Sequence, residues 1–328
     1  MKYLLLILLF VSCTSQEKLI SIEGNTMGTY YRVKAYTKKD ADELKQDVDK
    51  FLILFNNIFS TYLPDSEISK INRSKDLKAK VSQSFQRMLI LSQEIYKKSE
   101  GHFDITVSPI VNLWGFGPDG KKRIAPSDEQ IKLALKNIGS DHYQIKDKIL
   151  RMDKKLTFDM SAIAKGFGVD ELIKFLQYDG ITNLLVEIGG EVRTSGHKDP
   201  EQKTPWRVGI EGPEENLGTK ILKIINLKNR AMATSGSYRN YLKYGDKIFN
   251  HTINPKTGYP VEHKTVSVTV LEEYCADADA WATALMSMGV EKASQIAKRY
   301  DLSILIQYKE NDQIKTYTSP AFDKEMEN

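Results

Sequence analysis

Hydrophobic and polar side chains alternate in two short segments near the start of the chain. These segments are Leu19–Glu23 and Tyr30–Tyr36, with Gly24 and Gly28 between them. A period of two residues places neighbouring side chains on opposite faces, so we expect two strands here. Further strands are predicted at Asn183–Ile188 before the turn Gly189-Gly190, within Trp206–Val270, at Ser303–Gln307 and at Gln313–Thr318, with a hairpin at Lys148–Phe158.

Other segments carry apolar residues three and four positions apart. In Lys39–Phe59 they stand at positions 44, 48, 51, 52, 55 and 58, which predicts an amphipathic helix. Helices and strands are interleaved irregularly, which favours an α+β fold over a strict βαβ alternation. We find no repeat and no linker long enough to separate domains. The other predicted helices are Val81–Ser99, one that Ser127 caps, Ala164–Leu176, Asp277–Met288 and Val290–Arg299.

The first residues have the pattern of an export signal. Lys2 precedes the apolar run Tyr3–Val11, which is too short to span a bilayer, since a spanning helix takes about 20 residues. The next residues, Phe10-Val11-Ser12-Cys13, resemble the bacterial lipobox, in which cleavage precedes the cysteine and the thiol receives a diacylglycerol. The alternative is an ordinary secretory leader with an incidental cysteine. We expect a signal peptide at 1–12, a tether lipidated at Cys13 over 13–20, a folded domain at 21–321 and a tail at 322–328.

Composition excludes some partners. The chain has 47 basic and 43 acidic residues, a net charge of +4 and no long basic run, so nucleic acid is not an expected ligand. There are two cysteines. If Cys13 is acylated, Cys275 has no partner within the chain, and we interpret it as a packing residue. No second apolar stretch approaches transmembrane length, so the folded part is expected to be water-soluble.

Two segments contain residues suited to binding a planar ring or a phosphate. In Gly101–Asp104 with Trp114–Pro118, exposed aromatic rings beside glycines could stack on a planar ring; the alternative is a buried aromatic turn. In Asp159–Gly168, an acidic residue precedes a helix start, and Lys165 follows. Helix N-terminal amides attract phosphate, although Asp159 could equally be a simple N-cap.

Two later segments contain residues suited to catalysis. His251 follows Ala233–Tyr238 and lies beside an Asn-Pro-Gly turn, which makes it a candidate base, although a lone histidine can also be structural. Asp279 and Thr283 are four residues apart and would share one helix face. Carboxylate and hydroxyl oxygens suit Mg²⁺. The alternative is a helix start capped by Asp277 or Asp279.

Taken together, these segments resemble the ApbE family of FAD:protein FMN transferases. The resemblance runs from about Ser21 to about Ala321 and implies a single large, T-fold-related α+β domain of mixed sheets flanked by helices. Its motifs occur in the order of the family. They are Met27-Gly28-Thr29, Ser60-Thr61-Tyr62 with Asp65-Ser66-Glu67, Phe103–Gly117, Asp159–Gly168, Glu187–Glu191, Ala233–Tyr238, His251–Gly258 and Ala278–Leu285.

The resemblance also implies roles for individual positions. His251 matches the proposed base, and the Ala162 carbonyl, Asp279 and Thr283 match the Mg²⁺ ligands. Some relatives carry glutamate at the position of Lys165 and aspartate at that of Ala282, and the family pattern has aspartate where Asn254 stands. The positions that match the family's FAD site are Met27, Tyr62, Trp114, Gly115, Phe116, Asp159, Lys165 and Ile253.

The implied reaction is Mg²⁺-dependent transfer of the FMN moiety of FAD, its substrate, to a threonine or serine hydroxyl of an acceptor protein, with release of AMP. The implied acceptors are flavin-bearing subunits of membrane redox complexes, namely the sodium-pumping NADH:quinone reductase (Nqr) and the related Rnf complex. With the lipobox, this predicts an exported enzyme, lipid-anchored to a bacterial membrane, the inner membrane facing the periplasm. The alternatives are hydrolysis of FAD to FMN and AMP, and a lipoprotein that only binds flavin.

Overall fold

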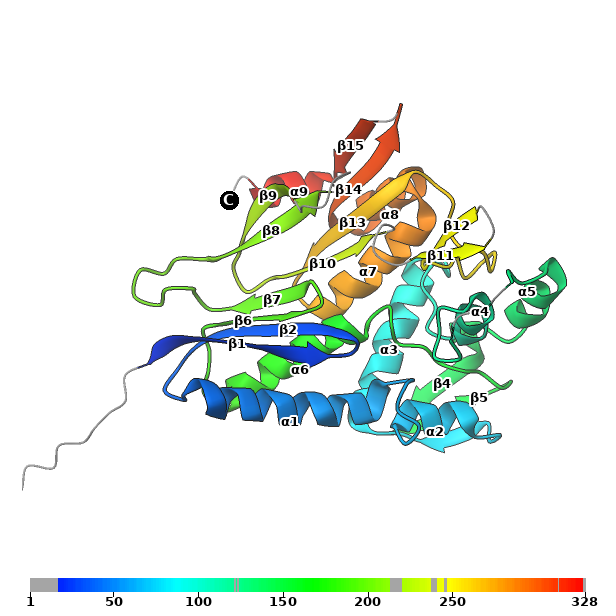
Figure 1. Cartoon of the computed structure of the whole chain (residues 1–328), viewed down its shortest axis with the longest axis horizontal. Coiled ribbons are helices and arrows are strands. Elements are labelled where there is room, and N and C mark those ends of the chain that lie inside the picture. Colours follow the sequence, from blue (N-terminus) through cyan, green and yellow to red (C-terminus); the bar gives the residue numbers. More distant parts are fainter. Residues whose placement is uncertain are drawn as a thin grey trace, which may run out of the picture.

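An eight-stranded antiparallel sheet forms the centre of the molecule (Figure 1). The computed structural model describes residues 17–120, 122, 124–212, 220–236, 241–244, 247–311 and 313–326. The strand order is β1-β2-β6-β7-β10-β13-β14-β15. These strands are β1 (Lys18–Thr26), β2 (Thr29–Thr37), β6 (Leu184–Ile188), β7 (Glu191–Ser195), β10 (Ala231–Gly236), β13 (Thr265–Glu272), β14 (Ser303–Glu310) and β15 (Gln313–Thr318).

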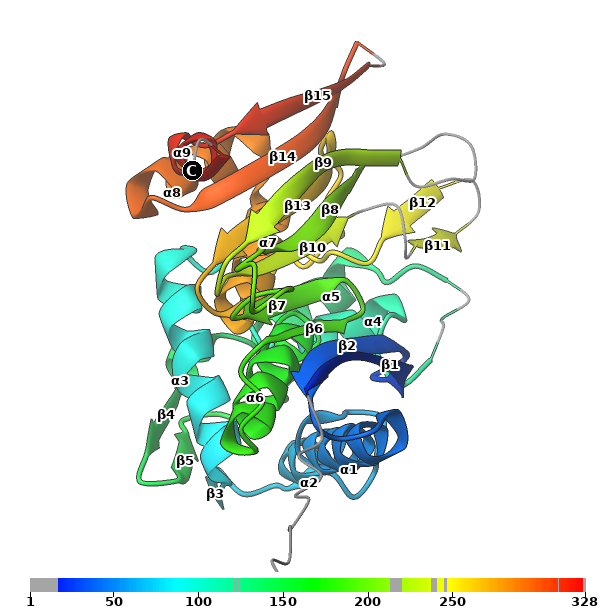
Figure 2. The same ribbon diagram turned by 90° about the vertical axis from the view of Figure 1, so that its left-hand side faces the viewer.

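Helices cover one face of this sheet, and a hairpin covers part of the other (Figure 2). Strand β2 shows why: Tyr31, Val33 and Ala35 are buried in a core shared with α1 and α6, whereas Arg32 and Lys34 face the opposite side. The helices are α1 (Ala41–Phe59), α2 (Glu67–Arg73), α3 (Gln83–Lys98), α4 (Ser108–Trp114), α5 (Asp128–Leu135), α6 (Ala164–Tyr178), α7 (Cys275–Met288), α8 (Val290–Tyr300) and α9 (Pro320–Met326).

Among the described residues, three small antiparallel sheets flank the central one. One has the order β3-β5-β4, and the 3-10 helix η1 (Ser140–His142) leads into it. The hairpin β8–β9 packs Trp206 and Ile225 into a core with Phe322 of α9. The remaining strands are β3 (Lys78–Lys80), β4 (Tyr143–Lys146), β5 (Ile149–Met152), β8 (Trp206–Gly212), β9 (Lys220–Leu227), β11 (Tyr241–Tyr244) and β12 (Lys247–Asn250).

The α+β class predicted from the sequence is confirmed, and the periodic helices and strands form close to their predicted bounds. The hairpin predicted at Lys148–Phe158 is wrong in position. The observed hairpin is β4–β5, and its turn consists of Asp147 and Lys148, both with positive φ. The apolar pattern beyond Met152 belongs to an irregular segment whose Leu156 and Phe158 are buried in the core.

The structure describes the C-terminal end of the predicted domain but not the leader predicted before its N-terminal end. The boundary at residue 321 falls inside α9, whose Phe322 is fully buried, so this helix packs as part of the fold. Residues 1–16, with the predicted leader and Cys13, lie outside the described residues. Within the described part of the chain, no helix combines the length and the apolar character needed to cross a membrane.

Candidate active site

Helices α6 and α7 are in close contact at Gly166. A Cβ atom at this position would lie 2.2 Å from the carbonyl oxygen of Cys275 and 2.8 Å from the Cβ of Asp279, so only glycine permits the approach. The contact lets Asp279 Oδ2 accept a hydrogen bond of 2.9 Å from the Gly166 amide. Because Ile163 supplies no side-chain cap, a carboxylate from a neighbouring helix satisfies this first-turn amide of α6.

Replacing Gly166 by alanine is expected to destabilise the protein by about 3 kcal/mol, because the added methyl overlaps backbone atoms that cannot rotate away. Gly168 provides the matched control in the same helix. A Cβ there would meet the flexible Met27 Cε at 3.0 Å, and the gain in helix propensity of up to about 1 kcal/mol offsets that contact. Denaturant unfolding measures both variants, and equal losses of stability would contradict the close-contact interpretation.

The cap is reciprocal, since α6 also caps α7. Asp170 accepts hydrogen bonds from the amides of Cys275 (3.0 Å) and Ala276 (2.9 Å), and its carboxylate pairs with Arg193 at 2.7 Å. Burial raises the pKa of Asp170, and the Arg193 charge opposes this effect. The two helices are thereby locked in register, which fixes the position of Asp279. In the sequence, Asp170 is recognisable only as an acidic residue on a largely apolar helix.

Lys165 is held between two carboxylates next to this contact. Its Nζ lies 2.9 Å from Glu191 Oε1 and 3.9 Å from Asp279 Oδ1. Burial alone would lower the pKa of Lys165, but the charges of Asp279 and Glu191 outweigh it and raise the pKa, so the ammonium form persists. Burial raises the pKa of Glu191 to about 7, with Lys165 acting in the opposite direction. Sequence reasoning assigned no role to Glu191, although it directly follows the Gly189-Gly190 turn.

Hydroxyl groups lie one helical turn further along α7. Thr283 follows Asp279 by four residues, as predicted for a shared face, and its Oγ1 lies 3.2 Å from Ser235 Oγ of β10. Ala162 lies in the turn that leads into α6. The fold therefore brings the segments of Ala162, Lys165, Asp279 and Thr283 to the contact between α6, α7 and β10.

The donors at this contact suit a hard cation. Among the described residues, no group of three or more His, Cys, Asp or Glu side chains could hold a metal ion. A cation here would instead combine Asp279 with the Thr283 hydroxyl and the Ala162 carbonyl, which are oxygen donors of the kind Mg²⁺ prefers. Glu191 Oε2 is buried and has no hydrogen-bond partner. An unsatisfied buried carboxylate oxygen at this contact fits the binding of a further positive group.

The aromatic turn at the end of α4 is buried. Trp114 is 2% exposed, its Nε1 donates a 2.8 Å hydrogen bond to the Gly258 carbonyl, and its ring centroid lies 5.1 Å from that of Phe249. Phe116 packs against the same cluster, and Gly115 ends α4 in the left-handed conformation. The hypothesis of an exposed, stacking Trp114 is therefore wrong, and the buried alternative holds. The ring instead anchors the loop that carries His251.

That loop follows β12 and contains His251 and Ile253. Its Asn250 side chain donates to the Val261 carbonyl at 2.7 Å and accepts from the Thr252 amide at 2.9 Å. Ile253 is 8% exposed and packs in the cluster that contains Trp114. His251 is half-buried between these anchored positions. Its backbone is thus held from both sides, as a positioned base requires.

Gly101–Asp104, the other part of the first candidate segment, serves the fold. Asp104 is buried and accepts hydrogen bonds from the Thr106 amide and hydroxyl and from the Ser140 hydroxyl. His102 lies 3.2 Å from the Ser287 hydroxyl, and burial lowers its pKa to about 4. A histidine that stays neutral and a carboxylate saturated with donors both stabilise the structure.

Three further predicted positions lie around the start of α6. Met27 adopts a positive φ of 51° in the β1–β2 turn and points its methyl group toward Gly168. Asp159 accepts from the Ser161 amide at 2.8 Å and so forms the turn before the helix. Tyr62 is 68% exposed, and partial burial together with the charge of Asp159 raises its pKa. Tyr62 is thus a free aromatic surface near this site.

Cys275 is a free cysteine, and its thiol is buried. Burial raises the pKa of this thiol well above its ordinary value. Its Sγ lies 3.7 Å from the Val192 carbonyl. A buried, protonated thiol is a poor nucleophile. The interpretation of Cys275 as a packing residue agrees with this environment.

The α+β fold carries a cluster of ammonium, carboxylate and hydroxyl groups at a helix N-terminus, an arrangement that is typical of enzymes that bind anionic groups. The ApbE family profile matches residues 27–306, and the chain belongs to the ApbE family. The FAD:protein FMN transferase of Vibrio cholerae is 37% identical over 322 residues, 96% of this chain and 95% of that protein. The FAD:protein FMN transferase of Escherichia coli K12 is 35% identical over 331 residues, 96% and 93% of the two chains.

Solved structures agree with this assignment. The flavin transferase ApbE from Vibrio cholerae superimposes with a TM-score of 0.85 at 36% identity and covers 94% of this chain and 99% of that one. The apo form of the flavinyl transferase ApbE from Pseudomonas stutzeri gives a TM-score of 0.86 at 32% identity, with 94% and 97% covered. The protein is therefore an enzyme of the transferase class.

Proposed function

We propose that this enzyme transfers the FMN moiety of FAD to a threonine or serine hydroxyl of an acceptor protein and releases AMP. The observation that carries the proposal is the cluster at the start of α6. There Asp279 is fixed against the Gly166 amide, beside Lys165 and Thr283. Such a cluster suits a pyrophosphate, and relatives that match nearly the whole chain are named for this transfer.

The transfer is one displacement at phosphorus. The acceptor oxygen forms a bond to the FMN phosphorus, the pyrophosphate P–O bond breaks, and its electron pair leaves with AMP. His251 would take the proton of the acceptor hydroxyl, and Lys165 would bring a positive charge to the pyrophosphate oxygens. Asp279, Thr283 and the Ala162 carbonyl would hold Mg²⁺. When bound, this ion neutralises negative charge that develops on the leaving phosphate.

The FAD itself would lie along the start of α6. Tyr62 offers an exposed ring beside Asp159, which suits contact with a planar flavin. Trp114 contributes by anchoring the loop of His251. The proposed FAD-binding positions are Met27, Tyr62, Gly115, Phe116, Asp159, Lys165 and Ile253, and Trp114 would act through the loop that its buried ring anchors.

Purified protein incubated with FAD and Mg²⁺, with and without an acceptor peptide, tests this proposal. AMP that forms only when the peptide is present supports transfer. AMP that forms equally without the peptide would show that the enzyme is an FAD pyrophosphatase. FAD that binds and is never cleaved would identify a flavin-binding protein and overturn both enzymatic functions.

We also propose that the enzyme acts on the exported side of a bacterial membrane, anchored to the inner membrane by lipid on Cys13. The sequence Phe10-Val11-Ser12-Cys13 supports this. Its proposed acceptors are flavin-bearing subunits of Nqr-like and Rnf-like membrane complexes. A lipid anchor would keep the enzyme beside them.

Replacing Cys13 by serine is therefore expected to remove the anchor and leave the folded domain intact. In cells fed a radiolabelled fatty acid, the wild-type protein should carry label and sediment with membranes, whereas the variant should do neither. Cys275→Ser is the control, and it should keep both the label and the membrane location. Labelling of the Cys13 variant would contradict lipidation at this residue.

A further inference from the structure

Strand β10 continues beyond its last pair with β7. The β7–β10 ladder consists of the pairs Arg193–Ala231 and Val192–Met232. On its other side, β10 stays paired with β13 as far as Gly236–Ser267. Along the part of the chain that the structure describes, no strand pairs with the β7-facing edge of Thr234–Gly236, whereas Ala233 before it is fully buried. Such an edge is a template on which another extended chain can pair.

The β7–β10 ladder ends early because the β6–β7 hairpin turns back at this point. Gly189 and Gly190 form the turn, with φ of 62° and 106°. A Cβ on Gly189 would lie 2.8 Å from the Thr29 side chain and 3.2 Å from Lys165 Cδ, so the turn is packed tightly against the active site. The sheet therefore opens beside Lys165.

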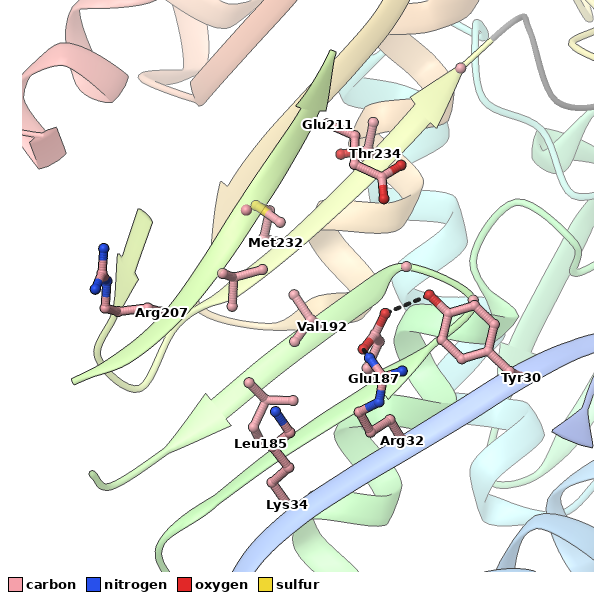
Figure 3. Close-up of a pocket in the computed structure, with 15 residues that line it drawn as sticks. Tyr30, Arg32, Lys34, Leu185, Glu187, Val192, Arg207, Glu211, Met232 and Thr234 are labelled. Atoms are coloured by element: carbon pink, nitrogen blue, oxygen red, sulfur yellow. Dashed lines mark hydrogen bonds and ion pairs between the residues drawn. The ribbon is translucent and has the colours of Figure 1, made fainter. Parts of the chain in front are cut away.

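A groove with a cavity of about 280 Å³ lies along this opening (Figure 3). The central sheet forms its floor with Leu185, Val192 and Met232, and β8 forms a wall with Val208. Gly190 and Thr234 line the groove from the two sides of the opening. The groove thus extends from the open edge across the sheet face that is opposite α6.

The residues that border the opening alternate between the groove and the active site. Thr234 lines the groove, and the next residue, Ser235, lies 3.2 Å from Thr283 on the helix side. Across the opening, Gly190 lines the groove, and the next residue, Glu191, binds Lys165. Side chains of a strand inserted between them would alternate in the same way.

We propose that an extended segment of the acceptor protein pairs with β10 along Thr234–Gly236. Its reacting threonine or serine then faces Thr283 and Lys165, and its neighbouring side chains lie in the groove. This inference rests on the proposed transfer function and adds how the acceptor is recognised. Main-chain pairing provides affinity, and the groove provides selectivity.

The charges in the groove indicate which segment fits. Glu187 is neutralised in place, because Tyr30 donates to it at 2.6 Å and Arg32 pairs with it at 3.3 Å. Lys34 and Arg207 line the groove away from Thr234 (Figure 3), and neither forms an ion pair with another described residue. Glu211 lies at the other end, beside Thr234. Acidic residues at a distance from the reacting hydroxyl therefore complement this groove.

Charge reversal tests this recognition. The probe is a short, fluorescently labelled synthetic peptide with one threonine and with aspartates several residues away from it, at the end expected to lie near Lys34 and Arg207. For the double variant Lys34→Glu/Arg207→Glu, the KM for this peptide should rise about 10-fold or more, with kcat at saturating peptide retained. A peptide with lysines in place of the aspartates should bind the double variant more tightly than it binds the wild-type protein. The control is Lys78→Glu/Arg151→Glu, an exposed cross-strand pair on the remote β3–β5 sheet, which should leave the KM unchanged.

Backbone methylation tests the strand pairing. Methylating alternate peptide nitrogens removes main-chain donors and keeps every side chain, so the methylated peptide should lose binding to the wild type. Fluorescence anisotropy in the presence of FAD measures docking without turnover. A peptide that binds and is never flavinylated would overturn the proposed function alone. Flavinylation with a KM that neither charge reversal nor methylation changes would overturn the docking proposal alone.

Discussion

Replacing Asp279 by alanine is expected to lower the rate of FMN transfer about 10³-fold. Asp279 is 2% exposed and fixed by the Gly166 amide, so its carboxylate is pre-positioned to hold the proposed Mg²⁺ that would accompany the pyrophosphate. When bound, Mg²⁺ would neutralise negative charge on the pyrophosphate, and loss of one pre-positioned electrostatic stabiliser of this kind costs about 10²–10³-fold in kcat. The rate of AMP release with acceptor at saturating FAD measures the effect.

Asp277→Ala is the matched control, two residues earlier on the same helix. Burial and the charge of Glu272 raise the pKa of Asp277 to about 7, so its removal relieves repulsion and should not weaken the fold. The variant Asp279→Asn can still accept a hydrogen bond from the Gly166 amide, so it removes the negative charge and keeps the packing. It should also be nearly inactive. Mg²⁺ titration by calorimetry should show weakened binding only for the Asp279 variants. Unchanged turnover or Mg²⁺ affinity in Asp279→Ala would reject this residue as a ligand.

Replacing His251 by alanine is expected to lower transfer by about 10²–10⁴-fold, the range for loss of a general base. The loop is anchored through Asn250 and the Trp114–Gly258 hydrogen bond, neither of which involves the imidazole. The variant should therefore fold and bind FAD with unchanged affinity. A fall in kcat with an unchanged Kd for FAD distinguishes a base from a structural histidine.

His142→Ala provides the comparison for this experiment. His142 pairs with Asp153 at 3.0 Å on the surface near β4, and its removal should leave transfer unchanged. An azole buffer such as imidazole should partly restore the His251 variant by replacing the missing base. If His251→Ala retains the wild-type rate, another group takes the proton of the acceptor hydroxyl.

The parts of the fold that the sequence predicted are those in which one periodic face is buried. Helix α1 buries Leu44, Val48 and Phe55 on one side, and β2 alternates over its whole length. The hairpin β4–β5 was misplaced because its turn consists of Asp147 and Lys148, which are not glycines although both adopt positive φ. Short helices such as α2 and α4 have too few turns to show a period.

The candidate site was predictable where its residues share one helix, as Asp279 and Thr283 do. Glu191 and Asp170 were missed because their roles depend on contacts between distant segments, namely Lys165 with Glu191 and Asp170 with the start of α7. Stacking was considered for Trp114 because glycines flank it, with a buried turn as the alternative, and its indole N–H in fact donates to the Gly258 carbonyl inside the fold. Tertiary hydrogen bonds of this kind leave no local pattern in a sequence.

The mass of an acceptor protein incubated with FAD, Mg²⁺ and this enzyme tests the central claim most directly. Transfer predicts a gain of one FMN less one water on a single threonine or serine, with AMP released in equal amount. Replacing that residue of the acceptor by valine should prevent the gain. An acceptor of unchanged mass, with FMN and AMP both free in solution, would contradict transfer and show that water takes the place of the acceptor hydroxyl.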